Sequence, residues 1–287
     1  MGKRWLWYLI SLLLIIPGLV SIGIRGFNYG IDYTGGNLIE IQFKQSVSVG
    51  QVRSQLDQLG LHGSSVREAG PNRFLLRTPE LTEERSKEVV DQLQKAFGQA
   101  DIARNEKVGA TVGGELTRKA LYALAIASVL QIIYITIRFE FYFAVAAILA
   151  LLHDALVVAG VFSLFQVEID GTFVAAILTI LGYSINDTIV VFDRIRENLQ
   201  ISKRESQPSI VNKSISQTLF RSISISSTVI LVLIALLTLG GTTTRVFALA
   251  MLIGTISGTY SSICVASPLW VDLQRLFGET RQAAKAV

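Results

Sequence analysis

Long apolar runs and one extended polar interval alternate along this chain of 287 residues. A run needs about 20 residues to cross the hydrocarbon of a bilayer as a helix. Six runs come close to or exceed this length, and we expect each to form a membrane-spanning helix. They are Trp5–Ile24, Ala120–Ile137, Phe141–Phe165, Thr172–Phe192, Ile223–Leu239 and Val246–Ser267.

The first apolar run follows Lys3 and Arg4, which is also how a signal peptide begins. Its apolar core is longer than the usual core of such a peptide, and no small-x-small cleavage pattern follows it. We therefore expect a retained anchor helix. Pro17 lies inside the run and predicts a kink there.

The polar interval between the first two runs predicts a small α+β domain. Strand patterns occupy 38–43, 65–68, 73–77 and 102–112. Two amphipathic stretches with helical spacing lie between them, and Ser48 and Thr82 stand where the N-caps of these helices would be. The resulting β-α-β-β-α-β order is that of ferredoxin-like modules.

The predicted fold is thus a polytopic α-helical membrane protein with one small ferredoxin-like α+β domain. Its expected parts are a terminus with the first helix, the α+β domain, a five-helix bundle and a tail, at 1–25, 26–118, 119–270 and 271–287. If the six helices alternate in direction, nearly all basic residues near their ends fall on one side. The positive-inside rule then places both termini in the cytoplasm and residues 26–118 outside it.

A glycine-rich turn, Gly30–Gly36, opens the polar interval. Asp32, Gly35 and Gly36 predict a tight turn with positive φ angles. Two interpretations stay open: a plain turn that joins a helix to a strand, or a docking or hinge element.

Two carboxylates, Asp154 and Asp187, lie inside predicted membrane helices. A charge at the centre of a bilayer costs roughly 2.5–3.5 kcal/mol on insertion scales, so such acids usually serve as a proton site, an ion site or half of a pair. Arg221, at the foot of the next helix, can lie at the depth of Asp187. A nearby arginine favours the charged carboxylate, whereas burial without it favours the neutral acid. A movement that separates the two would load or release a proton. A static pair is the alternative.

Other polar groups surround these acids in sequence. Ser184, Asn186 and Thr188 are expected to supply donors to Asp187. Asp154 is either part of the same relay or a hydrogen-bonded structural acid. His153 adjoins it, but neighbouring helical positions do not share a face, so the two are not expected to form a dyad.

Small residues in the same helices predict close helix packing. Gly182, Gly254 and Gly258 would let helices approach one another, and the last two form a Gly-x-x-x-Gly pair. Cys264 is the only cysteine, which excludes a disulfide framework and a cysteine metal site.

Several functional classes are disfavoured. The basic residues follow the topology and lack interleaved aromatics, so nucleic-acid binding is not expected. Ser184 with His153 lacks the sequence context of an intramembrane serine protease, and the two aspartates lack that of an intramembrane aspartyl protease. We expect no catalytic residues, no metal site and no cofactor other than protons as the coupling ion.

The segment Gly182–Asn198, GYSINDTIVVFDRIREN, resembles the fourth-helix signature of SecF-type members of the SecD/SecF family, which assists bacterial Sec protein export. The turn Gly30–Gly36 and the pair His153-Asp154 are similar to other marks of this family. So are Val108–Leu116, Arg138–Glu140 and Ser216–Leu219 with Arg221. The resemblance covers nearly the whole chain in order.

The resemblance implies a half of the resistance-nodulation-division (RND) superfamily fold in the bacterial cytoplasmic membrane. It implies SecD as a separate partner chain, the SecYEG channel, the SecA motor and unfolded preproteins as further partners, and YajC and YidC as additional candidates. It also implies use of the proton motive force late in translocation. By carry-over, Asp187, Arg221 and Asp154 would form the proton relay. The alternatives are a small-molecule exporter of the same superfamily and a scaffold that holds SecD without proton coupling.

Overall fold

The structure, a computed structural model, describes residues 1–202 and 204–278, with 110–113, 242, 243 and 278 described by their backbone alone. The chain forms two compact units: a helical unit, Met1–Asn28 with Tyr122–Val287, and an α+β unit, Tyr29–Leu121. The boundaries expected at 26 and 118 differ from these by three residues each. Of the expected tail at 271–287, residues 279–287 lie outside the described part of the chain.

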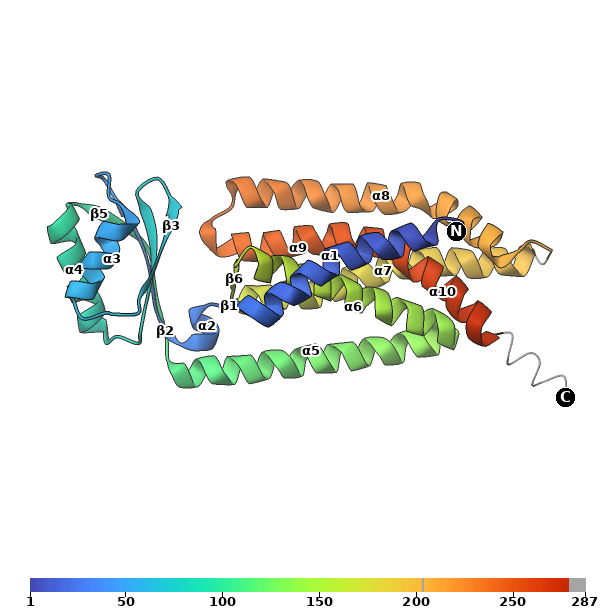
Figure 1. Cartoon of the computed structure of the whole chain (residues 1–287), viewed down its shortest axis with the longest axis horizontal. Coiled ribbons are helices and arrows are strands. Elements are labelled where there is room, and N and C mark those ends of the chain that lie inside the picture. Colours follow the sequence, from blue (N-terminus) through green and yellow to red (C-terminus); the bar gives the residue numbers. More distant parts are fainter. Residues whose placement is uncertain (203, 279–287) are drawn as a thin grey trace. The chain divides into compact units, whose positions relative to one another are not determined.

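The α+β unit contains one antiparallel four-stranded sheet with two helices packed against it (Figure 1). Its elements are α2 (Ile31–Thr34), β2 (Gly36–Phe43), α3 (Val49–Gln58), β3 (Ser65–Gly70), β4 (Arg73–Thr78), α4 (Glu83–Phe97) and β5 (Ala100–Val108). The strand order β3-β4-β2-β5 places the first and third strands of the module side by side. This is the ferredoxin-like arrangement, and the predicted element order is confirmed.

Alternating residues of the sheet supply the core of this unit. Ile39, Ile41, Phe74 and Leu76 are fully buried and face α3 and α4. Both predicted N-caps are confirmed. The Ser48 hydroxyl accepts from the Gln51 amide at 3.3 Å and completes a capping box. The Thr82 hydroxyl accepts from the Arg85 amide and so caps α4.

The last strand is shorter than predicted. It ends at Val108, and helix α5 begins at Ala110, so the strand expected over 102–112 is wrong beyond Val108. Val108 pairs with Gly36, where β2 begins. No residue of β2 lies beyond that point to continue the ladder of hydrogen bonds.

The turn before β2 requires glycine at two positions. Gly35 has φ +72° and Gly36 has φ +115°, a region that side chains rarely adopt. A Cβ on Gly36 would also lie 2.5 Å from the Thr78 carbonyl oxygen on β4. Asp32 lies in the short helix α2 just before this turn. The geometry fits a tight helix-to-strand turn; a docking role stays a prediction.

The helical unit holds the six long apolar helices that the sequence predicts, each long enough to cross a membrane (Figure 1). Its elements are α1 (Arg4–Arg25), α5 (Ala110–Arg138), α6 (Phe141–Leu164), α7 (Gly171–Ile201), α8 (Gln207–Leu239), α9 (Thr242–Ser261), η1 (Ser262–Ala266), α10 (Ser267–Leu273) and η2 (Gln274–Gly278). The part of α5 up to Leu121 belongs to the α+β unit. Two short strands, β1 (Asn28–Tyr29) and β6 (Glu168–Ile169), lie at helix ends.

Four helices extend past their predicted bounds, and one of them is α5, which begins at Ala110 rather than Ala120. α7 continues to Ile201 and α8 starts at Gln207, because polar side chains hold the two together beyond the apolar runs. The Asn198 amide donates to Ser214 Oγ and to Gln217 Oε1, each at 2.8 Å.

The sixth helix continues past Ser267 through a π-helical segment, η1. Pro268 cannot donate a backbone hydrogen bond, and a π-helical turn absorbs that interruption without ending the helix. The Ser267 hydroxyl donates to the Ser262 carbonyl at 2.9 Å and bridges the same turn.

Glycines set the closest helix contacts. A Cβ on Gly18 of α1 would lie 2.6 Å from the Cα of Gly160 on α6, and a Cβ on Gly254 of α9 would overlap the Ile180 side chain of α7. Gly258 likewise faces Ser184. The predicted role of Gly254 and Gly258 is confirmed, but Gly182 is exposed with no atom near its Cβ position.

Candidate functional site

Asp154 lies at the centre of the bundle, on α6, with none of its surface exposed. Its Oδ1 accepts from Ser257 Oγ at 2.6 Å. Its Oδ2 accepts from Ser184 Oγ at 2.6 Å and from Ser261 Oγ at 2.7 Å. The donors come from α7 and α9, so one carboxylate joins three helices.

A fourth group completes this set. His153 Nδ1 lies 3.0 Å from Asp154 Oδ1. An ionised carboxylate only accepts hydrogen bonds, whereas a protonated one must also donate. Three hydroxyl donors and the His153 ring thus hold the two oxygens of Asp154.

The expectation that His153 and Asp154 do not interact is wrong. Neighbouring positions are about 100° apart around a helix of 3.6 residues per turn, and α6 is enclosed: 56 % of its span is buried, against 6 % for the α5 span. Both side chains therefore point into the protein. The imidazole also lies beside the Tyr260 ring of α9, at 5.9 Å between centroids.

Asp187 has a different environment. It lies on α7, and its Oδ1 accepts from Ser222 Oγ of α8 at 2.6 Å. Its Oδ2 is buried and has no hydrogen-bond partner in the described part of the chain. Ser262 of η1 also acts on this carboxylate. Fewer polar groups thus hold Asp187 than hold Asp154, and its Oδ2 is the oxygen open to a proton.

Arg221 adjoins Ser222 on α8, so it lies at the level of Asp187, as the sequence predicts. Its side chain is exposed on the surface of the unit. Its charge still attracts the Asp187 carboxylate. The arginine is therefore placed to respond to the charge of Asp187 from outside the bundle core.

The donors predicted for Asp187 are wrong in detail. Ser184 donates to Asp154, and Asn186 is exposed. The Thr188 hydroxyl lies 2.8 Å from Ser262 Oγ and donates to the Ser184 carbonyl at 3.1 Å. Asp187 follows Ser184 by three residues. In a helix of 3.6 residues per turn, this places the two side chains about 60° apart around the helix axis. Ser184 therefore turns toward α6 and α9, whereas Asp187 turns toward α8.

Sequence reasoning missed Ser222, Ser257 and Ser261, which bind the two acids. Ser222 with Ser226 and Ser257 with Ser261 are each spaced by four residues. In an apolar helix, this spacing places two hydroxyls on one face. The four-residue spacing of the serines was visible in the sequence, but it did not indicate which acid each pair of hydroxyls would contact. The turn residues Asp32, Gly35 and Gly36 belong to the α+β unit, whereas both acids belong to the helical unit.

Two family models match this chain. The model described as "Protein export membrane protein SecD/SecF, C-terminal" matches residues 88–276. The "SecD/SecF GG Motif" matches residues 20–47, which include Gly35 and Gly36. Together they match parts of both units.

Curated relatives match over almost their full length. A "Protein translocase subunit SecF" of Sebaldella termitidis is 43 % identical, over 96 % of this chain and 91 % of the relative. The protein of the same name from Pseudomonas aeruginosa is 40 % identical, over 95 % and 91 %.

Two solved structures are similar as well. The crystal structure of SecDF from Thermus thermophilus matches with a TM-score of 0.89 and 39 % identity, over 96 % of this chain and 38 % of that one. SecDF in its super-membrane-facing form matches with a TM-score of 0.73 and 38 % identity, over 99 % and 40 %. The chain thus spans about two fifths of these SecDF chains.

Proposed function

This chain belongs to the SecD/SecF family of protein export membrane proteins, and we propose that it acts as the SecF subunit of a protein translocase. The family consists of transport subunits rather than enzymes, and the chain is a multi-pass membrane protein. The observation that carries the proposal is the identity of 43 % to a SecF subunit over 96 % of the chain.

The partner in this proposal is SecD, supplied as a separate chain. Support comes from the similarity to the SecDF structures and to a curated SecF subunit that is covered over 91 % of its own length. SecYEG, SecA and unfolded preproteins complete the assembly, with YajC and YidC as further candidates. The location is the bacterial cytoplasmic membrane, with both termini in the cytoplasm and residues 26–118 outside. The distribution of basic residues supports this orientation.

Asp187 is the proposed proton carrier, with no resident cofactor involved. When ionised, it accepts from Ser222 and attracts Arg221. A proton added to Oδ2 makes the side chain neutral, which removes the attraction to Arg221. The new O–H also needs an acceptor, because a buried donor without one is costly. Both effects favour a movement of α8 relative to α7.

Asp154 has a different part in this mechanism. Its three hydroxyl donors and its contact with His153 favour an anchoring role over a proton-carrying one. By joining α6, α7 and α9, it would keep these helices together as one body. The movement caused by protonation would then be confined to the side of the bundle that Asp187 faces.

The test is preprotein export in vesicles that contain SecYEG, SecA, SecD and this chain, with and without a proton gradient. We expect the gradient to stimulate export with the wild-type chain, and Asp187→Asn to abolish that stimulation while still co-purifying with SecD. Asp193→Asn is the control, because Asp193 lies on the same helix but in a half-exposed ion pair with Arg138.

Gradient-dependent export by Asp187→Asn at the wild-type level would refute the relay. In that case the chain would serve as a scaffold for SecD. Unchanged export on omission of the wild-type chain would refute the translocase role itself.

A further inference from the structure

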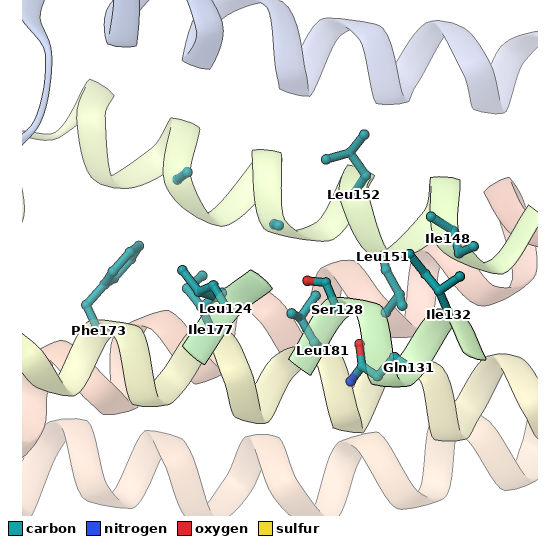
Figure 2. Close-up of a pocket in the computed structure, with 12 residues that line it drawn as sticks. Leu124, Ser128, Gln131, Ile132, Ile148, Leu151, Leu152, Phe173, Ile177 and Leu181 are labelled. Carbon is teal, nitrogen blue, oxygen red and sulfur yellow. The ribbon is translucent and has the colours of Figure 1, made fainter. Parts of the chain in front are cut away.

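An apolar groove lies among α5, α6 and α7, and Figure 2 shows the side chains that line it. Its volume is about 420 Å³. Phe173, Ile177 and Leu181 of α7 form one wall and are each at most 8 % exposed. Ala155 and Ala159 of α6 lie one turn apart along the groove. Their small side chains leave the space that larger residues would fill.

The groove opens sideways, out of the helical unit. On its α5 side, Ile132 is 40 % exposed, and on its α6 side, Leu152 is 53 % exposed. α5 itself packs little against the bundle, with only 6 % of its span buried. Every lining residue lies within a membrane-spanning helix. The groove therefore opens to the hydrocarbon interior of the bilayer.

Water is a poor occupant for this groove. Ser128 and Gln131 are the polar residues among its twelve lining residues. An apolar cavity of about 150 Å³ lined by leucine, isoleucine and phenylalanine stays dry in a soluble protein and binds small hydrocarbons. This groove is larger, similarly lined and surrounded by hydrocarbon.

A transmembrane helix of another chain does not fit its length. The lining runs from Leu124 to Ile132 on α5 and from Ile148 to Ala159 on α6, or about 12 and 16 Å at 1.5 Å per residue. A spanning helix needs about 30 Å. The groove has roughly the length of one leaflet, and it begins at Phe173, near the start of α7 at the membrane surface.

We propose that this groove is a lipid site that holds one acyl chain of a membrane phospholipid. The chain enters beside Phe173 and runs between α5 and the α6–α7 pair toward Ile148. It gains dispersion contacts with the aliphatic walls, which otherwise face a gap. The site also keeps α5 apart from α6 and α7. This inference does not depend on the export function.

The test uses the full chain in vesicles of phosphatidylethanolamine and phosphatidylglycerol, doped with a phospholipid that carries a photoreactive diazirine within one acyl chain. After irradiation, labelled residues are mapped by mass spectrometry. We expect Ile177 to be labelled at least as strongly as Leu149. Leu149 lies on α6 outside the groove and is 41 % exposed, whereas Ile177 is only 8 % exposed. Contact with bulk lipid alone would give the opposite order.

Filling the groove gives the second arm of the test. Ala155→Phe with Ala159→Phe should lower labelling of Ile177 by about tenfold and leave labelling of Leu149 unchanged. The control Leu149→Phe should leave Ile177 labelling unchanged. If the double variant loses its thermal unfolding transition, Ala159→Leu alone should lower Ile177 labelling several-fold.

Two results would overturn the proposal. One is labelling of Ile177 that is weaker than that of Leu149 or that persists in the filled variants. The other is loss of Ile177 labelling when SecD is reconstituted together with the chain, because the occupant would then be a protein.

Discussion

Asp154 is buried and Asp187 half-buried in the same bundle, and they meet different numbers of donors. Three hydroxyls and one imidazole face Asp154, whereas the hydroxyls of Ser222 and Ser262 face Asp187. A carboxylate held by several donors is fixed to the helices that supply them. At the scale of single residues, this contrast separates an anchoring acid from a proton-carrying one.

Ser257→Ala should destabilise the helical unit by about 1–2 kcal/mol. The substitution removes one hydrogen-bond donor from a buried carboxylate. A hydrogen bond to a charged group contributes about 1.5–3 kcal/mol to the stability of water-soluble proteins, and polar contacts within membranes contribute less on average. Equilibrium unfolding in mixed micelles measures the change. Ser227→Ala, at an exposed position of α8, should be nearly neutral. Equal effects of the two variants would contradict the anchoring role of Asp154.

Gly36→Ala should destabilise the α+β unit by about 1–3 kcal/mol, the usual range for a strained backbone position. The added Cβ meets the Thr78 carbonyl, and φ is positive. Amide hydrogen exchange of β2 and β4 in the full chain should become faster. Gly50→Ala, in α3 with no close contact at its Cβ position, should leave exchange unchanged or slow it. Wild-type exchange in Gly36→Ala would show that the glycine is not needed for the turn.

At the scale of elements, the sequence predicted the six membrane helices and the four strands well, because apolar run length and alternation determine both. It misplaced the ends of α7, α8 and the sixth helix. A helix that continues into the polar region depends on side-chain contacts between elements, such as Asn198 with Ser214. A π-helical turn that absorbs Pro268 has no signature in hydrophobic periodicity.

The contact of α9 with α7 depends on glycine. Gly254→Ala should destabilise the helical unit by about 1–3 kcal/mol, the usual range for overpacking, because its Cβ overlaps Ile180. Gly182→Ala is the matched control, since its Cβ meets nothing within 4 Å, and a small gain in stability is expected from helix propensity. The same unfolding measurement applies. If neither substitution lowered the free energy of unfolding, the close contact of α9 with α7 would not contribute to stability.

The N-terminus of α4 should contribute to pH-dependent stability. Hydrogen bonds from its own backbone amide and from the Thr82 hydroxyl lower the pKa of Glu84. Because the folded-state pKa is the lower one, the contribution is present above the unfolded pKa of about 4.3 and is lost as pH falls through the folded value. Glu84→Gln should flatten this part of the pH profile, as measured by hydrogen exchange of α4 between pH 7 and 3. An unchanged profile would contradict the assignment.

At the scale of the whole molecule, the sequence indicated two parts and the chemistry of the acids, but not the partners of each acid. The depth of Asp187 and Arg221 follows from helix order. The serines of Asp154 and the open groove beside α5 depend on how helices far apart in sequence rotate against one another. That information lies in packing contacts such as Gly258 against Ser184, which a single sequence does not display.

The most direct test of the account is infrared difference spectroscopy of the reconstituted chain between high and low pH. A protonated carboxyl group has its own C=O stretching band, which a carboxylate lacks. We predict that a band appearing at low pH disappears in Asp187→Asn and persists in Asp154→Asn. A band that persists in Asp187→Asn, or that is lost only in Asp154→Asn, would contradict the assignment of the proton to Asp187.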